Sequence, residues 1–351
     1  MNLKQNLKHE SSKNFWQALP KPIMILAPMA DVTDAAFRRV IAKYGKPDVM
    51  WTEFVSADGL FLGGQRGREV LMKDLMFTEA ERPIVAQFFT ARPEMMKKAA
   101  ALALELGFDG VDINMGCPDR SIEKQGAGAA LIKTPALARE IIRAAKEGVR
   151  GLLPVSVKTR TGFNVSQLEK WLPELLAENP ATIIVHARTR KEMSKVPARW
   201  EEVKRAVEIR DEIQGGKNNF PAGETIDRTL IFGNGDVADL ADAKIKAETT
   251  GADGIMLGRA IFGNPWLFDR DLNPSKKDIS IKKRLEVLVE HTYLFEELLG
   301  GIKNFAIMKK HFKAYVNGWD GAKEMRMQLM LAENAKQVDE IISTYLKNGL
   351  K

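Results

Sequence analysis

Short runs of apolar residues, rich in β-branched side chains, recur along the first three quarters of the chain, with segments of helical character between them. The runs are continuous and do not alternate with polar residues, which is typical of strands in a parallel sheet covered by helices. Eight such runs occur, at residues 23–27, 49–53, 84–88, 110–114, 153–158, 182–186, 229–232 and 254–257. Helices are expected between them at 34–44, 93–106, 135–147, 165–178, 199–213 and 239–249.

This alternation predicts the fold class. Eight strand-then-helix units over about 250 residues match the size of a TIM (β/α)8 barrel. A doubly wound sheet is the alternative, although it would usually have fewer strands for this length. After about Asn273 the strand pattern stops, and helical patterns follow at 281–299, 302–317 and 322–346. The sequence therefore predicts an α/β chain with an N-terminal extension at 1–20, a barrel at 21–272 and an all-helical domain of three or four helices at 278–351.

Two stretches interrupt the regular pattern. Residues 271–277, which include Pro274, are expected to link the barrel to the helical domain. Residues 215–227 read as a polar loop inserted before the seventh strand, with Gly215 and Pro221 among its turn-forming residues. This loop is longer than most barrel loops.

Composition narrows the class of protein. Of 351 residues, 45% are hydrophobic and 28% are charged, which are globular values and argue against a disordered or fibrous chain. The single cysteine excludes an intrachain disulfide, a Cys-based zinc site and an iron–sulfur cluster, so a reducing, cytoplasmic location is expected. No apolar run approaches the roughly 20 residues of a membrane span, and the first 20 residues do not resemble a secretory signal. The net charge of +7 permits a nucleic-acid partner without requiring one.

Glycine clusters at two strand ends point to a phosphate site. In a TIM barrel the active site is built from the C-terminal ends of the strands. Gly233-Asn234-Gly235 and Gly258-Arg259 follow the seventh and eighth strands, where barrels commonly bind phosphate. Glycine lets backbone N–H groups approach the anion, and Arg259 can pair with it bidentately. The alternative is a pair of tight turns, but the two clusters together favour phosphate.

Lys158 and His186 are polar residues at the ends of the fifth and sixth strands. A lone histidine is often structural, but the position of His186 beside Lys158 at the strand ends favours a role in the site. Neither residue has metal-ligand spacing to another histidine, so no metal is expected.

Cys117 is the main candidate for chemistry. A single cysteine is usually a small apolar filler. This one lies between Gly116 and Pro118, just past a strand end, in a segment that cannot be regular structure. At its reference pKa of about 8.5 a thiol is mostly protonated at pH 7, which suits a proton donor better than a nucleophile.

Taken together, these blocks resemble the dihydrouridine synthase family, the flavoenzymes that reduce uridine in tRNA. The Asn-Met-Gly-Cys-Pro block at 114–118 is highly specific, whereas a Gly-Arg ending is shared with other flavin barrels. The blocks run in the family's order from about residue 22 to 270, and the helical tail is similar to the family's second domain. The matching segments are APMADVTD at 27–34, DINMGCP at 112–118, VKTRTG at 157–162, HARTR at 186–190, NGD at 234–236 and GR at 258–259.

The resemblance implies a cofactor, FMN, and a reductant, NADPH or NADH. Hydride from the reduced flavin would add to C6 of the uracil, Cys117 would protonate C5, and Asn114 would contact the target base. Lys158 would stabilise the anionic reduced flavin. The uridine must leave the tRNA stack to reach such a pocket. The residues implied to hold FMN are Pro28, Met29 and Ala30 against the ring, Gln87, Lys158 and His186 beside it, and Asn234, Gly235, Asp236, Gly258 and Arg259 at the ribityl and phosphate end.

A basic stretch from Lys303 to Arg326 is the expected tRNA-binding face of the helical domain. The alternative is an ordinary solvated helix face. Arg160, Arg188 and Arg190 at the barrel mouth would extend the face. The residues expected to contact tRNA in the helical domain are Lys309, Lys310, Lys313 and Arg326.

Two other functions stay open at this point. A flavin barrel that acts on a small molecule, as a dihydroorotate dehydrogenase does, would have no use for the basic helical tail. A non-catalytic RNA-binding protein would not bind FMN. The loop at 215–227 is longer than expected in the family, so the subfamily and the modified uridine stay open, and a monomer is expected.

Overall fold

A computed structural model describes residues 14–215, 228–270 and 279–347. The loop expected at 215–227 and the linker expected at 271–277 lie, except for Gly215, outside the described residues. The same holds for residues 1–13 of the expected N-terminal extension.

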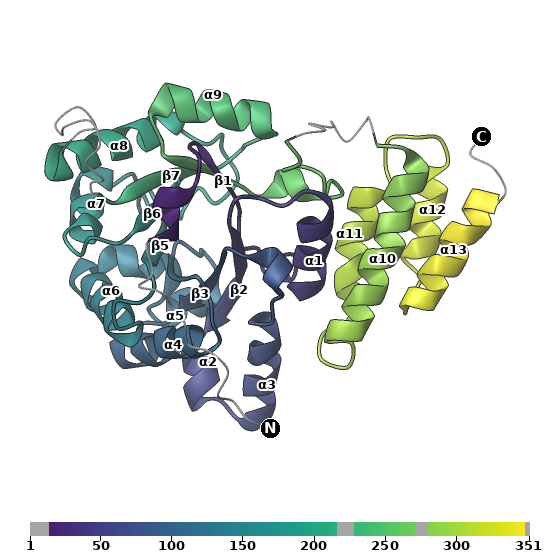
Figure 1. The fold of residues 1–351 in the computed structure, drawn as a ribbon, viewed down its shortest axis with the longest axis horizontal. Coiled ribbons are helices and arrows are strands. Elements are labelled where there is room, and N and C mark those ends of the chain that lie inside the picture. The colour runs from purple at the N-terminus through teal and green to yellow at the C-terminus, as the bar shows by residue number, and fades with distance from the viewer. Residues whose placement is uncertain (1–13, 216–227, 271–278, 348–351) are drawn as a thin grey trace.

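Eight parallel strands form a closed barrel (Figure 1). Each strand pairs with its neighbour around the ring, and β1 pairs with β8 in the register Ile23 to Gly254. A bridge between Ile25 and Val49 joins β1 to the start of β2 and completes the circle. This confirms the TIM barrel and excludes the doubly wound alternative. The strands are β1 (Ile23–Leu26), β2 (Met50–Ser56), β3 (Ile84–Phe89), β4 (Gly110–Met115), β5 (Val155–Arg160), β6 (Thr182–His186), β7 (Leu230–Asn234) and β8 (Gly254–Leu257).

The helices that cover the barrel include all six that the sequence predicts. These are α1 (Ala35–Tyr44), α4 (Pro93–Glu105), α6 (Pro135–Gly148), α7 (Leu168–Leu176), α8 (Trp200–Gln214) and α9 (Leu240–Thr250). Three further helices were not predicted: α2 (Ala57–Leu62), α3 (Gln65–Asp74) and α5 (Arg120–Lys124). Helix α3 has no fully buried residue, and it contacts the core only near its C-terminal end, through Leu71 and Met72.

The barrel strands are apolar on both faces because each face is buried in a separate core. Residues facing outward pack against the helices in the larger core. Residues facing inward, among them Ile25, Val85 and Phe232, form a smaller core inside the barrel. Trp16, from a 3-10 helix at Phe15–Ala18, is fully buried in this inner core, with its ring centroid 5.4 Å from that of Phe232. The segment just before β1 therefore belongs to the interior of the barrel.

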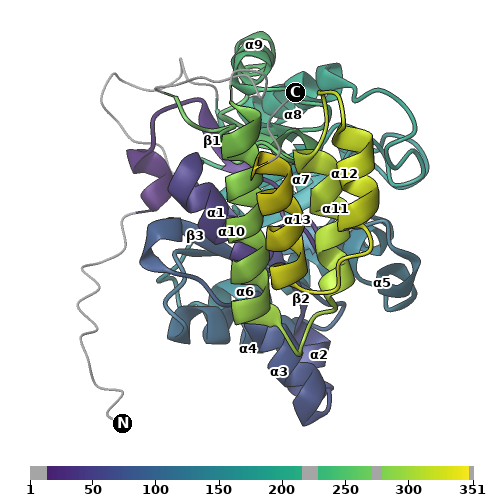
Figure 2. The same ribbon diagram turned by 90° about the vertical axis from the view of Figure 1, so that its right-hand side faces the viewer.

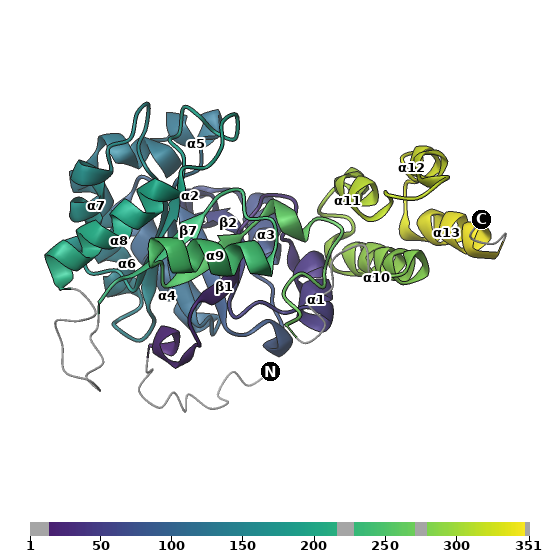
Figure 3. The same cartoon turned by 90° about the horizontal axis from the view of Figure 1, so that it is seen from above.

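The C-terminal region is all-helical, as predicted, and its helices lie side by side (Figure 2). They are α10 (Ile281–Leu299), α11 (Met308–Tyr315), α12 (Ala322–Leu329) and α13 (Ala335–Lys347). The prediction of one helix over 322–346 is wrong, because α12 ends at Leu329 and a second helix, α13, begins at Ala335. The side chain of Asn334, just before α13, accepts the Gln337 N–H at 2.9 Å. Helix α10 packs on α1, so the domain lies on the α1 side of the barrel (Figure 3).

Candidate active site

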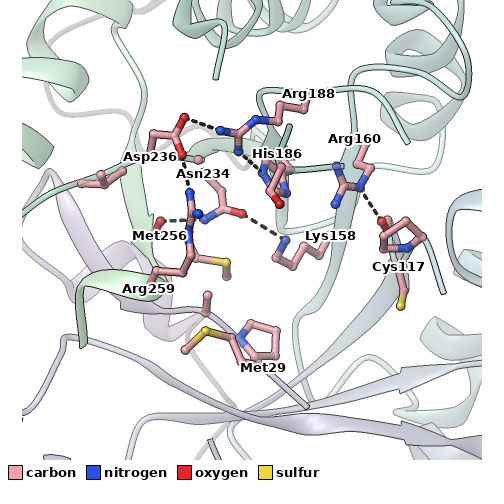
Figure 4. A pocket seen from close by; sticks show the side chains of 18 of the residues that line it. Met29, Cys117, Lys158, Arg160, His186, Arg188, Asn234, Asp236, Met256 and Arg259 are labelled. Carbon is pink, nitrogen blue, oxygen red and sulfur yellow. Dashed lines mark hydrogen bonds and ion pairs between the residues drawn. The ribbon is translucent and has the colours of Figure 1, made fainter. Parts of the chain in front are cut away.

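A cavity of about 710 Å³ opens at the C-terminal ends of the strands (Figure 4). This volume is typical of a small-molecule or cofactor site. Ala30, Arg190 and the four basic residues expected in the helical domain do not line it. The predicted residues that do line it are Pro28, Met29, Gln87, Asn114, Cys117, Lys158, Arg160, His186, Arg188, Asn234, Gly235, Asp236, Gly258 and Arg259.

Part of the lining is apolar. Ala27, Pro28 and Met29 continue from β1, and Met256 projects from β8. Phe54, on β2, also lines the cavity. Phe54 was not predicted from the sequence: it directly follows the strand expected at 49–53, and nothing distinguishes it there from a core residue. Together these side chains offer a surface suited to a flat ring system.

One end of the cavity is cationic. Arg188, only 2% exposed, pairs with Asp236 and also donates to the Val196 carbonyl at 2.6 Å. Arg259 donates to the other Asp236 oxygen at 2.5 Å, so Figure 4 shows two guanidinium groups directed at one carboxylate. Burial works against ionisation of Asp236, but the Arg188 and Ala198 hydrogen bonds and the two positive charges outweigh it and lower its pKa. The Arg259 side chain is 67% exposed and is therefore accessible to an anionic ligand.

Lys158 and His186 face the centre of the cavity in different charge states. The Lys158 Nζ donates to Asn234 Oδ1 at 3.2 Å. Burial, and then the charge of Arg160, lowers the pKa of Lys158 to about 8, which leaves it mostly protonated at pH 7. Burial and the surrounding cations lower the pKa of His186 well below its usual value, so its ring is neutral. Arg188 Nη1 lies 3.2 Å from His186 Nε2, and because a guanidinium only donates, Nε2 accepts and Nδ1 carries the proton.

A chain of buried side chains holds the loop that carries Cys117. Asn114 Oδ1 accepts the backbone N–H groups of Cys117 at 2.9 Å and Gly116 at 3.1 Å. Its Nδ2 donates to Gln87 Oε1 at 3.0 Å, and Gln87 Nε2 donates to Asp112 Oδ2 at 2.5 Å. The Asp112 carboxylate therefore sets the orientation of both amides. Asp112 was not singled out from the sequence, although it lies two residues before Asn114 on the same strand face.

Arg160 fastens the same loop from the other side. Its Nε donates to the Gly116 carbonyl at 2.7 Å, and its Nη1 donates to the Thr189 carbonyl at 3.1 Å. The residue is 7% exposed. Arg160 thus joins the loop after β4 to the loop after β6 and places a positive charge near the cysteine.

The Cys117 thiol is protonated at neutral pH. Burial raises its pKa, and the Asp119 charge adds to the effect, while the Asp119 backbone N–H and the charges of Arg160 and Lys158 oppose it only in part. In Figure 4 its side chain lies on the other side of the view from Asp236. The cavity therefore has a neutral proton donor at one side and a cationic end at the other.

The basic residues expected to bind tRNA divide into two groups. Lys313 is exposed and Lys309 is partly exposed on α11, where each is accessible to a phosphate. The side chains of the second group are engaged within the protein. Lys310 Nζ lies 3.3 Å from the Asp31 carbonyl, Arg326 donates to the Val316 carbonyl at 2.8 Å, and Arg190 pairs with Glu123. The basic stretch was also expected to use Lys303, and this is wrong: Lys303 is 9% exposed and its Nζ lies 2.7 Å from carboxylates of both Glu53 and Asp74.

Within the described ranges, no group of three or more His, Cys, Asp or Glu side chains is arranged to hold a metal ion. None of the described helices has the length and apolar character of a membrane span. The donor set of the cavity suits a different ligand. An apolar surface, a polar middle with Gln87, Lys158 and Asn234, and a cationic end with accessible Arg259 fit a flat ring joined to a phosphate, as in FMN.

Comparison with known proteins agrees with this fit. The family model described as "Dihydrouridine synthase (Dus)" matches residues 25–349. A Bacillus subtilis protein named "Probable tRNA-dihydrouridine synthase 2" is 40% identical over 332 residues, which cover 94% of this chain and 95% of that protein. A Staphylococcus epidermidis protein named "Probable tRNA-dihydrouridine synthase" is 38% identical over 339 residues, covering 95% and 96%.

Solved structures give likeness at the level of the fold. A complex titled 2-naphthoyl-CoA reductase with 2-naphthoyl-CoA aligns with a TM-score of 0.53 and 10% identity, covering 85% of this chain and 57% of that one. At this identity the likeness supports the barrel architecture alone.

Proposed function

The chain belongs to the dihydrouridine synthase family, and on that premise we propose that it is an FMN-dependent tRNA-dihydrouridine synthase reduced by NADPH or NADH. The observation that carries the proposal is Cys117: a protonated thiol, on a backbone held by Asn114, in the lining of a cavity whose far end is cationic. A proton donor and a phosphate-binding end on opposite sides are what reduction of a base by a flavin mononucleotide needs.

Three groups of residues would hold FMN: one at the face of its ring system, one at the polar edge of the ring and one at the phosphate end. When bound, reduced FMN supplies the hydride that adds to C6 of the uracil ring. Pro28 and Met29 would lie against the ring system, whereas Ala30, expected there from the sequence, does not line the cavity; Gln87, Lys158 and His186 would contact the polar edge of the ring. A protonated Lys158 beside a neutral His186 provides one positive charge for that edge. The ribityl and phosphate end would be held by Asn234, Gly235, Asp236, Gly258 and Arg259.

Cys117 completes the reduction as a general acid. Negative charge develops at C5 and the neighbouring carbonyl as C6 is reduced, and the neutral Cys117 thiol donates its proton to C5. Asn114 has two tasks in this proposal. Its oxygen holds the Cys117 N–H, and of its two Nδ2 hydrogens only one is needed by Gln87, which leaves the other for an oxygen of the target uracil.

The tRNA would lie across both domains. Lys309 and Lys313 on α11 are accessible to backbone phosphates, whereas Arg190 at the barrel mouth is paired with Glu123 and adds little positive charge to the surface. Arg160 and Arg188 are buried at the cavity, so any contact they make would be to the extruded base and not to the tRNA backbone.

The test is dihydrouridine formation in tRNA taken from a host without its own synthases, measured by mass spectrometry. Cys117→Ala is expected to bind FMN as tightly as the unaltered protein and to lose about 100-fold or more of its activity, the usual range for a general acid. Full activity of this variant would contradict the acid role. An unaltered protein that binds FMN but forms no dihydrouridine would contradict the tRNA function and favour a small-molecule substrate.

A further inference from the structure

The turn that follows β1 lines the cavity and has an unusual backbone. Its apex, Asp31, has a φ of +53°, in the left-handed region that residues other than glycine seldom adopt. The amides of Val32 and Thr33 donate to the Met29 carbonyl at 3.1 and 3.0 Å, and the Met29 N–H donates to Thr33 Oγ1 at 2.9 Å. The conformation of Asp31 thus determines where Pro28 and Met29 lie in the cavity.

Glu53 holds the apex of this turn from β2. Its Oε1 accepts the Asp31 N–H at 2.5 Å, and its Oε2 accepts from Lys303 Nζ at 2.7 Å. Glu53 is 4% exposed, so its charge is costly unless it is paired. Burial raises the pKa of Glu53 to about 7, and the Lys303 charge is the largest influence that opposes this rise.

Lys303 comes from the helical domain, in the segment between α10 and α11. Its Nζ also lies 2.7 Å from Asp74 Oδ1, at the end of α3, so one lysine joins β2, α3 and the helical domain. Lys310 of α11 reaches the Asp31 carbonyl at 3.3 Å, but this side chain is 43% exposed and contributes less. Both backbone groups of Asp31 are therefore held by contacts that depend on the helical domain.

We propose that Lys303 is a positioning residue for the cofactor, and that the helical domain, acting through Lys303 and Glu53, holds the turn at residues 28–33 in the shape that binds FMN. The inference rests on the proposed function, because it takes the cavity as the FMN site. It gives the helical domain a second task besides RNA binding. A consequence is reciprocity: FMN stabilises the docking of the helical domain by as much as docking strengthens FMN binding.

The test is the dissociation constant of FMN, measured on the full chain from the change in flavin fluorescence on binding. Lys303→Met keeps the length of the side chain and removes its charge. It is expected to weaken FMN binding about tenfold, the effect of losing one charge-assisted hydrogen bond. The matched control is Lys336→Met, which removes an exposed lysine of the same domain, 3.9 Å from Glu340, and is expected to leave FMN affinity unchanged.

A second pair of variants separates positioning from misfolding. Glu53→Gln with Lys303→Met, and Glu53→Leu with Lys303→Met, both remove the charges of Glu53 and Lys303 and leave Asp74 equally unpaired, but only glutamine keeps an oxygen for the Asp31 N–H. Circular dichroism melting establishes that both are folded. The glutamine form is expected to bind FMN about tenfold more tightly than the leucine form. Equal affinities would overturn the inference, whereas failure of the unaltered protein to bind FMN would contradict the proposed function instead.

Discussion

Two clusters of charge flank the turn at residues 28–33, and they are balanced differently. The lining of the cavity holds four cationic side chains, Lys158, Arg160, Arg188 and Arg259, and one carboxylate, Asp236. On the other side, in what we call the interface cluster, each cation is paired with carboxylates of the protein itself: Lys303 with Glu53 and Asp74, and Arg38 with Glu81. The comparison teaches that cations at a cavity with too few carboxylate partners indicate an anionic ligand, whereas cations that are all paired within the protein indicate a structural role.

The largest expected effect is a loss of stability on breaking the buried ion pair between Arg38 and Glu81. Arg38 and Glu81 have fully buried side chains, with Arg38 Nε 2.7 Å from Glu81 Oε2. Arg38→Met leaves the carboxylate buried alone and should lower the free energy of unfolding by about 3–5 kcal/mol, measured by urea denaturation. Replacing both residues with apolar ones should recover much of the loss. A decrease below about 1 kcal/mol in the single variant would argue against the interface cluster as a structural device.

Removing a surplus charge should affect binding and leave stability nearly unchanged. Arg259 is 67% exposed, so Arg259→Ala should shift the melting temperature little. It should weaken FMN binding by about 10- to 100-fold, because a charge-assisted bond to the phosphate is lost. Riboflavin, which lacks the phosphate, is the control and should bind both forms alike. Equal FMN affinity of the two forms would place the phosphate elsewhere.

Acid should weaken the interface between the barrel and the helical domain. The rings of His291 and His311 lie 4.6 Å apart and pack on Phe37 of α1. Burial lowers both pKa values, that of His311 to about 3. Each ring gives its full stability above its ordinary pKa of about 6.5, and below that pH the unfolded chain takes up protons that the folded one does not. The loss should be about 1 kcal/mol per ring over the first pH unit below 6.5.

The measurement is the free energy of unfolding at pH 6.5 and 5.5. Replacing both histidines with phenylalanine should remove this part of the pH dependence, while the carboxylates continue to contribute theirs. Lys310 lies near His311 and Tyr315 packs beside His291, with Glu290 and Tyr44 in turn near Tyr315, so the comparison is made between variants at the same pH. An identical slope in both proteins would show that the rings are not the source.

The smallest expected effect is on the rate of reduction, when Asp112 is replaced below the loop that carries Cys117. Asp112→Ala removes the acceptor that orients Gln87 and, through it, Asn114. The rate constant for reduction of tRNA should fall about tenfold, as for one lost hydrogen bond. Asp112→Asn keeps an oxygen for Gln87 and should retain most of the rate. Equal loss in both variants would mean that the negative charge matters and the orientation does not.

The fold and most of the cavity were predictable because they depend on local pattern. Strands buried on both faces are apolar without interruption, and polar groups at their ends must converge once the barrel closes. Contacts between distant segments were not predictable. Lys303 looks like any basic surface residue until α10 packs on α1. The carbonyls that hold Arg160 carry no sequence signal, since every residue has one. Helix α3 buries no residue completely, and residues 330–334 interrupt what looks in the sequence like one continuous helical pattern.

The turn at residues 28–33 also has a consequence for synthesis. It lies near the start of the chain, yet Lys303, which holds it through Glu53, is made after more than four fifths of the 351 residues. The strand before the turn, β1, also cannot complete its pairing early, because its partner β8 is not synthesised until Leu257. A ribosome therefore releases the first segment of the cofactor site long before the residues that give it its shape. Mature affinity for FMN should appear only when the last helices have emerged.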